Sequence, residues 1–132
     1  ERSRGLGDVY KRQALMSRAT EHMAARRIGE AVALFSEVID RAPDFAEAWN
    51  KRATAHYLAQ DYAASVADIH RTLELEPRHF GAIAGLGLIL MRRNDHTGAL
   101  QAFERVLSIH PNARGARMHV EILTKMLREN SV

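Results

Sequence analysis

The side chains of this sequence that could do chemistry are few, and its histidines come first. The chain has seven histidines and no cysteine, so a thiolate metal site and a cysteine nucleophile are excluded. His22 and His56 occupy equivalent places of two stacked units, where they could meet around a metal ion. The alternative, which we favour, is that each histidine is hydrogen-bonded within its own unit. We therefore predict no metal and no other cofactor.

Other catalytic patterns are also missing. The run GLGL at 85–88 is not a phosphate-binding loop, because it lies in an apolar stretch and no lysine follows it. HExxH does not occur in the sequence. The serines at 17, 36, 65 and 108 have no patterned histidine and aspartate partners, so a Ser–His–Asp combination here would be accidental. We predict that the chain is not an enzyme.

The elements that would position such residues repeat along the chain. Pro43, Pro77 and Pro111 are the three prolines of the sequence, and they are evenly spaced. At this proline period, residues 12–45, 46–79 and 80–113 agree in the sizes of their side chains. Bulky residues fill the fourth, twenty-fourth and twenty-eighth columns, and small ones the eighth and twentieth: Leu15, Trp49, Ile83; Phe35, Ile69, Phe103; Ile39, Leu73, Leu107; Ala19, Ala53, Gly87; Ala31, Ser65, Ala99.

Each unit predicts two helices. Apolar residues recur at steps of three and four, which is helical spacing, and polar breaks occur near 26–27, 60–61 and 94–95. The small columns would let the paired helices approach closely, and each proline would close the second helix. Residues 114–130 predict one more amphipathic helix, whose apolar stripe is Ala116, Val120, Leu123 and Leu127.

These columns resemble the tetratricopeptide repeat, most closely in the middle unit AEAWNKRATAHYLAQDYAASVADIHRTLELEP. The resemblance implies an all-α fold, a right-handed α–α superhelix with repeats at 14–45, 46–79 and 80–113 and a capping helix at 114–130. Arg18 and Arg52 depart from the pattern, because they stand where the repeat has leucine. An acid would have to pair with such an arginine if it were buried, and for Arg52 either Asp68 or Asp40 is the expected partner.

Residues 1–13 precede the first repeat and contain a segment that also occurs in a translated sequencing adaptor. The segment DVYKRQ at 8–13 is what one reading frame of a transposon-end adaptor encodes (GAT GTG TAT AAG AGA CAG). We therefore expect residues 1–13 to be translated adaptor or disordered. They carry four basic and two acidic residues, so the remainder has 15 basic and 14 acidic residues, a net charge of +1 instead of +3. On that charge we predict no nucleic-acid partner, and no apolar run reaches the roughly 18 residues of a membrane span.

The resemblance places partner peptides on the concave side, which the first helix of each repeat lines. The residues that it implies for the groove are Met16, Thr20, Met23, Glu47, Asn50, Lys51, Thr54, Tyr57, Ala84, Leu88 and Met91. All five methionines fall at groove positions, and methionine suits surfaces that accept apolar partners. For Met16, Met23 and Met91 the alternative of gap-filling in the core stays open, and Met118 and Met126 are expected to pack.

We expect a protein-interaction module, a scaffold or adaptor, that binds an apolar or amphipathic peptide of another protein. The family's clamp for the acidic tails of heat-shock chaperones is not matched, because the corresponding places hold Met16, Thr20, Lys51, Gly81 and Gly85, with one cation among them. The alternatives are a regulatory or docking segment of a larger enzyme, and an RNA-binding helical repeat. The low charge and the single aromatic groove residue, Tyr57, argue against RNA.

Two further expectations concern the context of the chain. A missing helix before Leu15 would leave an apolar face there and promote weak self-association. The stretch APDFAEAWNKRAT also resembles short bacterial repeat proteins of unknown role that are often made with an export signal, which implies the periplasm in preference to the cytoplasm.

Overall fold

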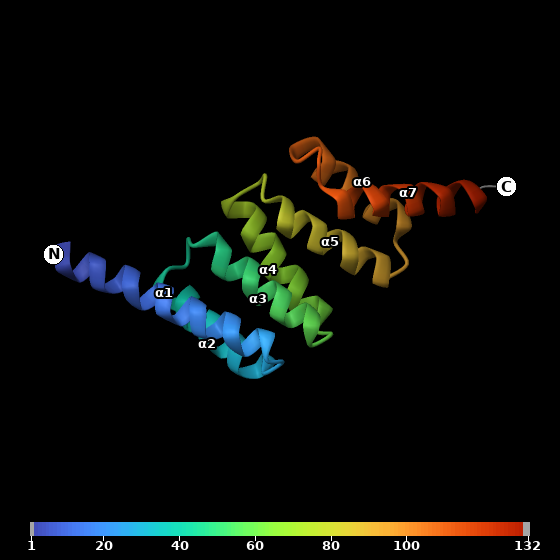
Figure 1. The fold of residues 1–132 in the computed structure, drawn as a ribbon. Coiled ribbons are helices and arrows are strands. Elements are labelled where there is room, and N and C mark those ends of the chain that lie inside the picture. Colours follow the sequence, from blue (N-terminus) through green and yellow to red (C-terminus); the bar gives the residue numbers. More distant parts are fainter. Residues whose placement is uncertain (1, 131–132) are drawn as a thin grey trace. The chain divides into compact units, whose positions relative to one another are not determined.

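Within residues 2–130, seven α-helices account for the fold (Figure 1). The computed structural model describes the backbone of residues 2–130 and the side chains of residues 5–130, and this part of the chain contains no β-strand. The helices are α1 (Arg2–Ala24), α2 (Ile28–Arg41), α3 (Ala46–Leu58), α4 (Tyr62–Leu75), α5 (Phe80–Arg92), α6 (His96–Ile109) and α7 (Arg114–Glu129). They form two compact units, α1–α4 and α5–α7.

The helices repeat at the proline period. The first helices α3, α5 and α7 begin at Ala46, Phe80 and Arg114, and these starts are separated by the same interval as the prolines. The second helices α2, α4 and α6 begin at positions 28, 62 and 96, which keep that interval again. The all-α pattern of helix pairs followed by one more helix, predicted from the sequence, is therefore confirmed.

The turn inside each pair has one geometry. Arg26, Gln60 and Asn94 follow the first helices and have φ values of 66°, 62° and 61°, in the left-handed region. The next N–H of each turn donates to a carbonyl five residues earlier, at 2.8–2.9 Å, as in a Schellman motif. The polar breaks of the sequence are thus helix C-caps that reverse the chain within three residues.

The turn between pairs contains the proline. The N–H groups of Phe45, His79 and Ala113 donate to carbonyls three residues earlier, which places each proline second in a four-residue turn. Proline suits this place because its fixed φ matches the turn. Each proline carbonyl also accepts a side-chain hydrogen bond, from Trp49 Nε1 (2.9 Å), Arg105 Nη2 (2.9 Å) and Arg117 Nη2 (2.6 Å).

The first helix includes the segment that the sequence analysis set apart. Residues 2–13 are helical and form the first part of α1. The segment has no proline, and Arg12 from its last turn lies 4.5 Å above the ring of Phe45, which ties the helix to the end of the first pair. The adaptor origin of residues 1–13 and the repeat boundaries stay predictions.

The small columns allow the close approach expected of them. In the first unit, Ala19, Ala31, Phe35 and Ala55 form one buried cluster drawn from α1, α2 and α3. On α4, the buried Ser65 donates from Oγ to the carbonyl of Ala53 on α3 at 2.7 Å. A side-chain oxygen reaches the facing backbone only where two helices pack closely, so these columns set the spacing within a pair.

Arg52 on α3 is held by helices on both sides. Its Nε and Nη2 donate to Oδ2 and Oδ1 of Asp68 on α4, both at 2.8 Å, and its Nη1 donates to Ser36 Oγ on α2 at 3.0 Å. Asp68 is therefore the partner, while Asp40 adds only longer-range attraction. The hydrogen bonds to Asp68 raise the pKa of Arg52 above its ordinary value, against the opposing effect of burial. The guanidinium stays charged and links α2, α3 and α4.

In the second unit, Gly87 makes the closest approach. A Cβ at this position of α5 would lie 2.8 Å from the ring of Phe103 on α6, inside van der Waals contact. The ring itself is buried and stacks on His119 of α7, with centroids 4.5 Å apart and an interplanar angle of 8°. Phe103 thus packs between α5 and α7, and only glycine fits beside it.

Replacing Gly87 by alanine is expected to destabilise the fold. Alanine favours helix by about 1 kcal/mol over glycine, but overpacking a core costs roughly 1–3 kcal/mol, and the stacked ring has little room to move. We expect a net loss of about 1 kcal/mol in the free energy of unfolding, measured by urea denaturation. Gly115→Ala on α7 is the control, because nothing lies within 4 Å of its Cβ, and it should be neutral or stabilising. A gain in the free energy of unfolding for Gly87→Ala would mean that the Phe103 ring moves to make room for the added methyl group.

Replacing Arg52 by leucine, the residue usual at this place of the repeat, tests the ion pair. Asp68 is 4% exposed, so the substitution leaves a buried carboxylate without its bidentate partner. We expect the free energy of unfolding to fall by roughly 2–4 kcal/mol, and part of the loss to return in Arg52→Leu/Asp68→Leu. Arg18→Leu is the matched control, since Arg18 occupies the same column but is exposed, and should change stability by less than about 0.5 kcal/mol. Equal stability of both single variants would refute the role of the pair.

Candidate peptide-binding surface

The predicted groove residues of the first repeat lie on one face of α1. Met16, Thr20 and Met23 are spaced four and three residues apart, as helical neighbours are. Both methionines are half-buried and pack against the cluster that contains Ala31 and Phe35. Thr20 is exposed and donates from Oγ1 to the Met16 carbonyl at 2.9 Å. The two methionines therefore fill the edge of the core, as the gap-filling alternative held, while part of each remains accessible.

The second repeat supplies a more polar set from α3. Thr54 is exposed and donates from Oγ1 to the Asn50 carbonyl at 3.2 Å, and the ring of Tyr57 lies 5.5 Å from that of Tyr62. One turn beyond Thr54, Leu58 is 38% exposed at the end of the helix. The four remaining predicted residues of this helix are half-buried: Glu47, Asn50, Lys51 and Tyr57.

The third repeat supplies small and aliphatic side chains. Ala84, Leu88 and Met91 follow one another at steps of four and three along α5 and are half-buried. They belong to the second unit, whereas the predicted residues of α1 and α3 belong to the first. The structure thus brings the predicted residues together in two sets, and a single groove that joins them stays a prediction.

Two apolar residues of α7 are exposed, and one of them departs from the expectation. Met118, which was expected to pack, is 54% exposed, and Ile122 is 44% exposed. The expectation for Met118 was wrong because α7 turns Ala116 and Leu123 to the core instead. The repeat itself carried the signal, since Met118 and Ile122 stand one proline period after Ala84 and Leu88.

The histidines that suggested a metal have local partners. His22 accepts a hydrogen bond at Nδ1 from Arg27 Nε at 2.7 Å, and His56 Nε2 lies 3.7 Å from Asp68 Oδ2. Among the described residues, no group of three or more histidine, aspartate and glutamate side chains is arranged to hold a metal ion. In the same part of the chain, no helix has both the length and the hydrophobicity that crossing a bilayer requires.

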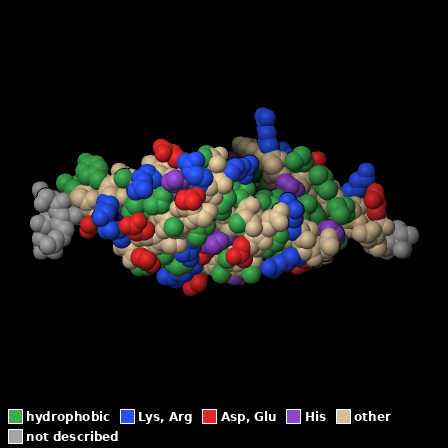
Figure 2. Space-filling view, turned by 90° about the horizontal axis from the view of Figure 1, so that it is seen from below, with side chains coloured by type: hydrophobic (Ala, Val, Ile, Leu, Met, Phe, Trp, Pro, Cys, Tyr) green, Lys and Arg blue, Asp and Glu red, His purple; other side chains and the backbone are tan. Residues whose placement is uncertain are grey.

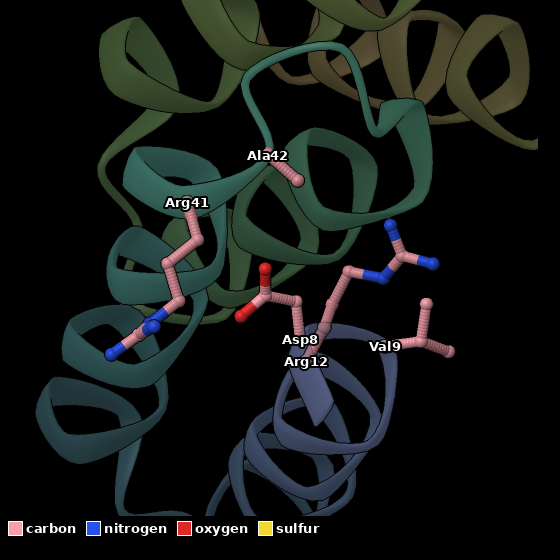
Figure 3. A pocket seen from close by; sticks show the side chains of 5 residues that line it. All are labelled: Asp8, Val9, Arg12, Arg41 and Ala42. Carbon is pink, nitrogen blue, oxygen red and sulfur yellow. The ribbon is translucent and has the colours of Figure 1, made fainter. Parts of the chain in front are cut away.

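A surface pocket of about 250 Å³ lies away from the predicted residues, between α1 and the end of α2 (Figure 3). Its lining is Asp8, Val9, Arg12, Arg41 and Ala42. Figure 3 shows the Asp8 carboxylate pointing between the side chains of Arg12 and Arg41. The carboxylate offsets part of the positive charge, and three of the five residues come from the segment 1–13. The pocket holds no arrangement of acid, base and nucleophile.

The charges on the surface are mixed. On the face drawn in Figure 2, basic and acidic side chains alternate over both units, with hydrophobic side chains between them. A protein that follows a nucleic-acid backbone needs a continuous basic stripe, and this face has none.

Comparison with known proteins identifies the repeats. The sequence profile described as tetratricopeptide repeat matches residues 16–68 and again 51–114. A TPR repeat-containing protein of Rhizobium etli is 38% identical over 116 residues, which cover 88% of this chain and 57% of that protein. Serine/threonine-protein phosphatase 5 of Rattus norvegicus is 21% identical over 95% of this chain but only 25% of its own length.

A solved structure shows the same fold. The first TPR domain of Spaghetti (RPAP3), in a complex with the HSP90 peptide SRMEEVD, superposes with a TM-score of 0.84 at 19% identity. The match covers 90% of this chain and 94% of that domain. This chain spans about a quarter to just over half of the curated relatives reported above. The profile match, the repeated helix pairs and this likeness agree, and the chain belongs to the tetratricopeptide repeat family.

Proposed function

We propose that this chain is a protein-interaction module that binds an apolar or amphipathic peptide segment on the faces of its first helices. One observation carries the proposal. In residues 14–130, every large hydrophobic side chain that is exposed lies on a first helix, or on α7, which has the same register: Leu58, Phe80, Met118 and Ile122. The second helices α2, α4 and α6 have none there. Exposed apolar groups confined to one class of helix favour a binding surface over random scatter.

The related structure supports a peptide as the ligand, but this chain lacks the set of cations that would hold an acidic peptide. The Spaghetti (RPAP3) domain binds a peptide that ends in Asp and contains two Glu. In this chain Lys51 is the single cation at the five places that matter for such a clamp, and it is half-buried. We therefore propose apolar contacts as the main source of affinity, at a roughly micromolar Kd, or about −8 kcal/mol.

A docking segment within a longer protein is the second candidate function. The length comparison favours it, because the related stretches are 57% of the Rhizobium protein and 25% of phosphatase 5. Three quarters of the phosphatase lies outside the match, so its activity does not transfer to this chain. In this role the same surface would bind a partner, and a part of the longer protein outside this stretch would carry out the chemistry. A periplasmic location stays a prediction from the resemblance.

Selection from a displayed library of random peptides tests the proposed function. We expect enrichment of peptides with apolar anchors, and a roughly tenfold higher Kd for the selected peptides with the Asn50→Ala/Tyr57→Ala variant. The control is His70→Ala/Glu74→Ala, which alters two exposed residues of α4 and should change the Kd less than about twofold.

Three results would contradict the proposal: no enrichment, equal losses in both variants, or retention of RNA on filters that falls steeply with salt. The last would favour the RNA-binding alternative, because phosphate contacts weaken as salt rises.

A further inference from the structure

The last helix carries two apolar stripes where a cap needs one. Its inner stripe consists of Ala116, Val120, Leu123 and Leu127, of which Ala116 and Leu123 are buried and the others half-buried. A terminal helix normally turns polar residues outward to stay soluble. On α7, Met118 and Ile122 lie one turn apart on the outer side, and the half-buried Met126 continues the row at the same step. The second stripe does not contribute to the core described above.

Cations accompany this second stripe. Arg114 lies one turn before Met118, and Lys125 follows Ile122 by three residues, so both fall on the exposed side of the helix. The helix as a whole holds Arg114, Arg117, Lys125 and Arg128 against Glu121 and Glu129. Arg117 also holds the Pro111 carbonyl, which fixes its direction. The outer face of α7 is therefore apolar along one edge and mainly basic along the other.

We propose that the outer face of α7 is a docking site for an acidic amphipathic helix of a partner protein. The inference rests on the proposed function and names the partner's chemistry. Met118 and Ile122 are spaced by one helical turn, so apolar side chains four residues apart on a facing helix match them in step. Acidic side chains beside that row would lie opposite Arg114 and Lys125 and fix the orientation.

A second copy of this chain fits the face less well. Two α7 faces related by a twofold axis run either antiparallel, which brings Arg114 of one copy toward Lys125 of the other, or parallel, which brings each of these cations toward its own counterpart. Like charges placed opposite each other across an interface oppose association. Charge complementarity thus selects an acidic partner over self-pairing.

Two designed peptides test the site directly on the full chain. One is a helical peptide of about 14 residues with leucines at i, i+4, i+7 and i+11 and glutamates beside them, and the other has lysine in place of each glutamate. Fluorescence anisotropy should give a Kd in the tens of micromolar for the glutamate peptide and a value at least about tenfold higher for the lysine peptide. Met118→Ser/Ile122→Ser should raise the first Kd roughly tenfold, and Arg114→Glu/Lys125→Glu should reverse the preference.

The control variant is His70→Ala/Glu74→Ala, which alters two exposed residues of α4 and should leave the glutamate-peptide Kd within about twofold. The exposed positions of Met118, Ile122, Arg114, Lys125, His70 and Glu74 permit a check of folding by circular dichroism. Absence of binding, equal affinity for both peptides, an unchanged Kd in the α7 variant, or an equal loss in the α4 variant would overturn the inference.

Self-association of the chain that Met118→Ser/Ile122→Ser abolishes would also overturn it, in favour of a second copy. The proposed function fails separately, since library peptides that depend on Asn50 and Tyr57 would still support it if the glutamate peptide did not bind.

Discussion

The close approach of the two helices in each pair is the constraint on which the rest of the structure depends. Small side chains at two columns bring backbone near backbone, as the 2.7 Å bond from Ser65 to the Ala53 carbonyl and the ring of Phe103 beside Gly87 show. Little apolar area is buried by these columns themselves. The large side chains must therefore find space beside the contact, and Phe35, Ile69 and Phe103 fill it one per repeat.

This constraint also decides where polar residues can enter. Arg52 replaces an apolar residue next to the contact between α3 and α4, and it is accommodated because Asp68 and Ser36 face it from the two neighbouring helices. Its guanidinium further lies 5.1 Å from the ring of Trp49, whose indole is fixed by the Pro43 carbonyl. Arg52 makes directional hydrogen bonds where an apolar side chain would only be buried. It therefore specifies the arrangement of three helices more than it adds to stability.

Much of the fold was predictable because a repeat multiplies weak signals. The three prolines, the small columns and the polar breaks were enough to place every helix pair. For Arg52 the sequence left two possible partners, Asp68 and Asp40, and the geometry of the hydrogen bonds decided for Asp68. The exposure of Met118 follows from the rotation of α7 that turns Ala116 and Leu123 to the core, and the position of Met118 one proline period after Ala84 was the sequence signal for it. The helical state of residues 2–13 was not predicted, because helix formation depends on local propensity and on contacts such as that of Arg12 with Phe45.

Where core columns are fixed, the remaining columns vary in polarity along the chain without a packing cost. The fifth column reads Met16, Asn50, Ala84, Met118, and the ninth reads Thr20, Thr54, Leu88, Ile122. In the ninth, both threonines bond to their own helices, whereas the leucine and isoleucine have no polar group to satisfy. In the ninth column polarity thus falls from the first unit to the second, while the fifth column is polar only at Asn50. Equivalent positions of the repeat therefore differ in chemistry between the two units, because no packing contact fixes the residue type there.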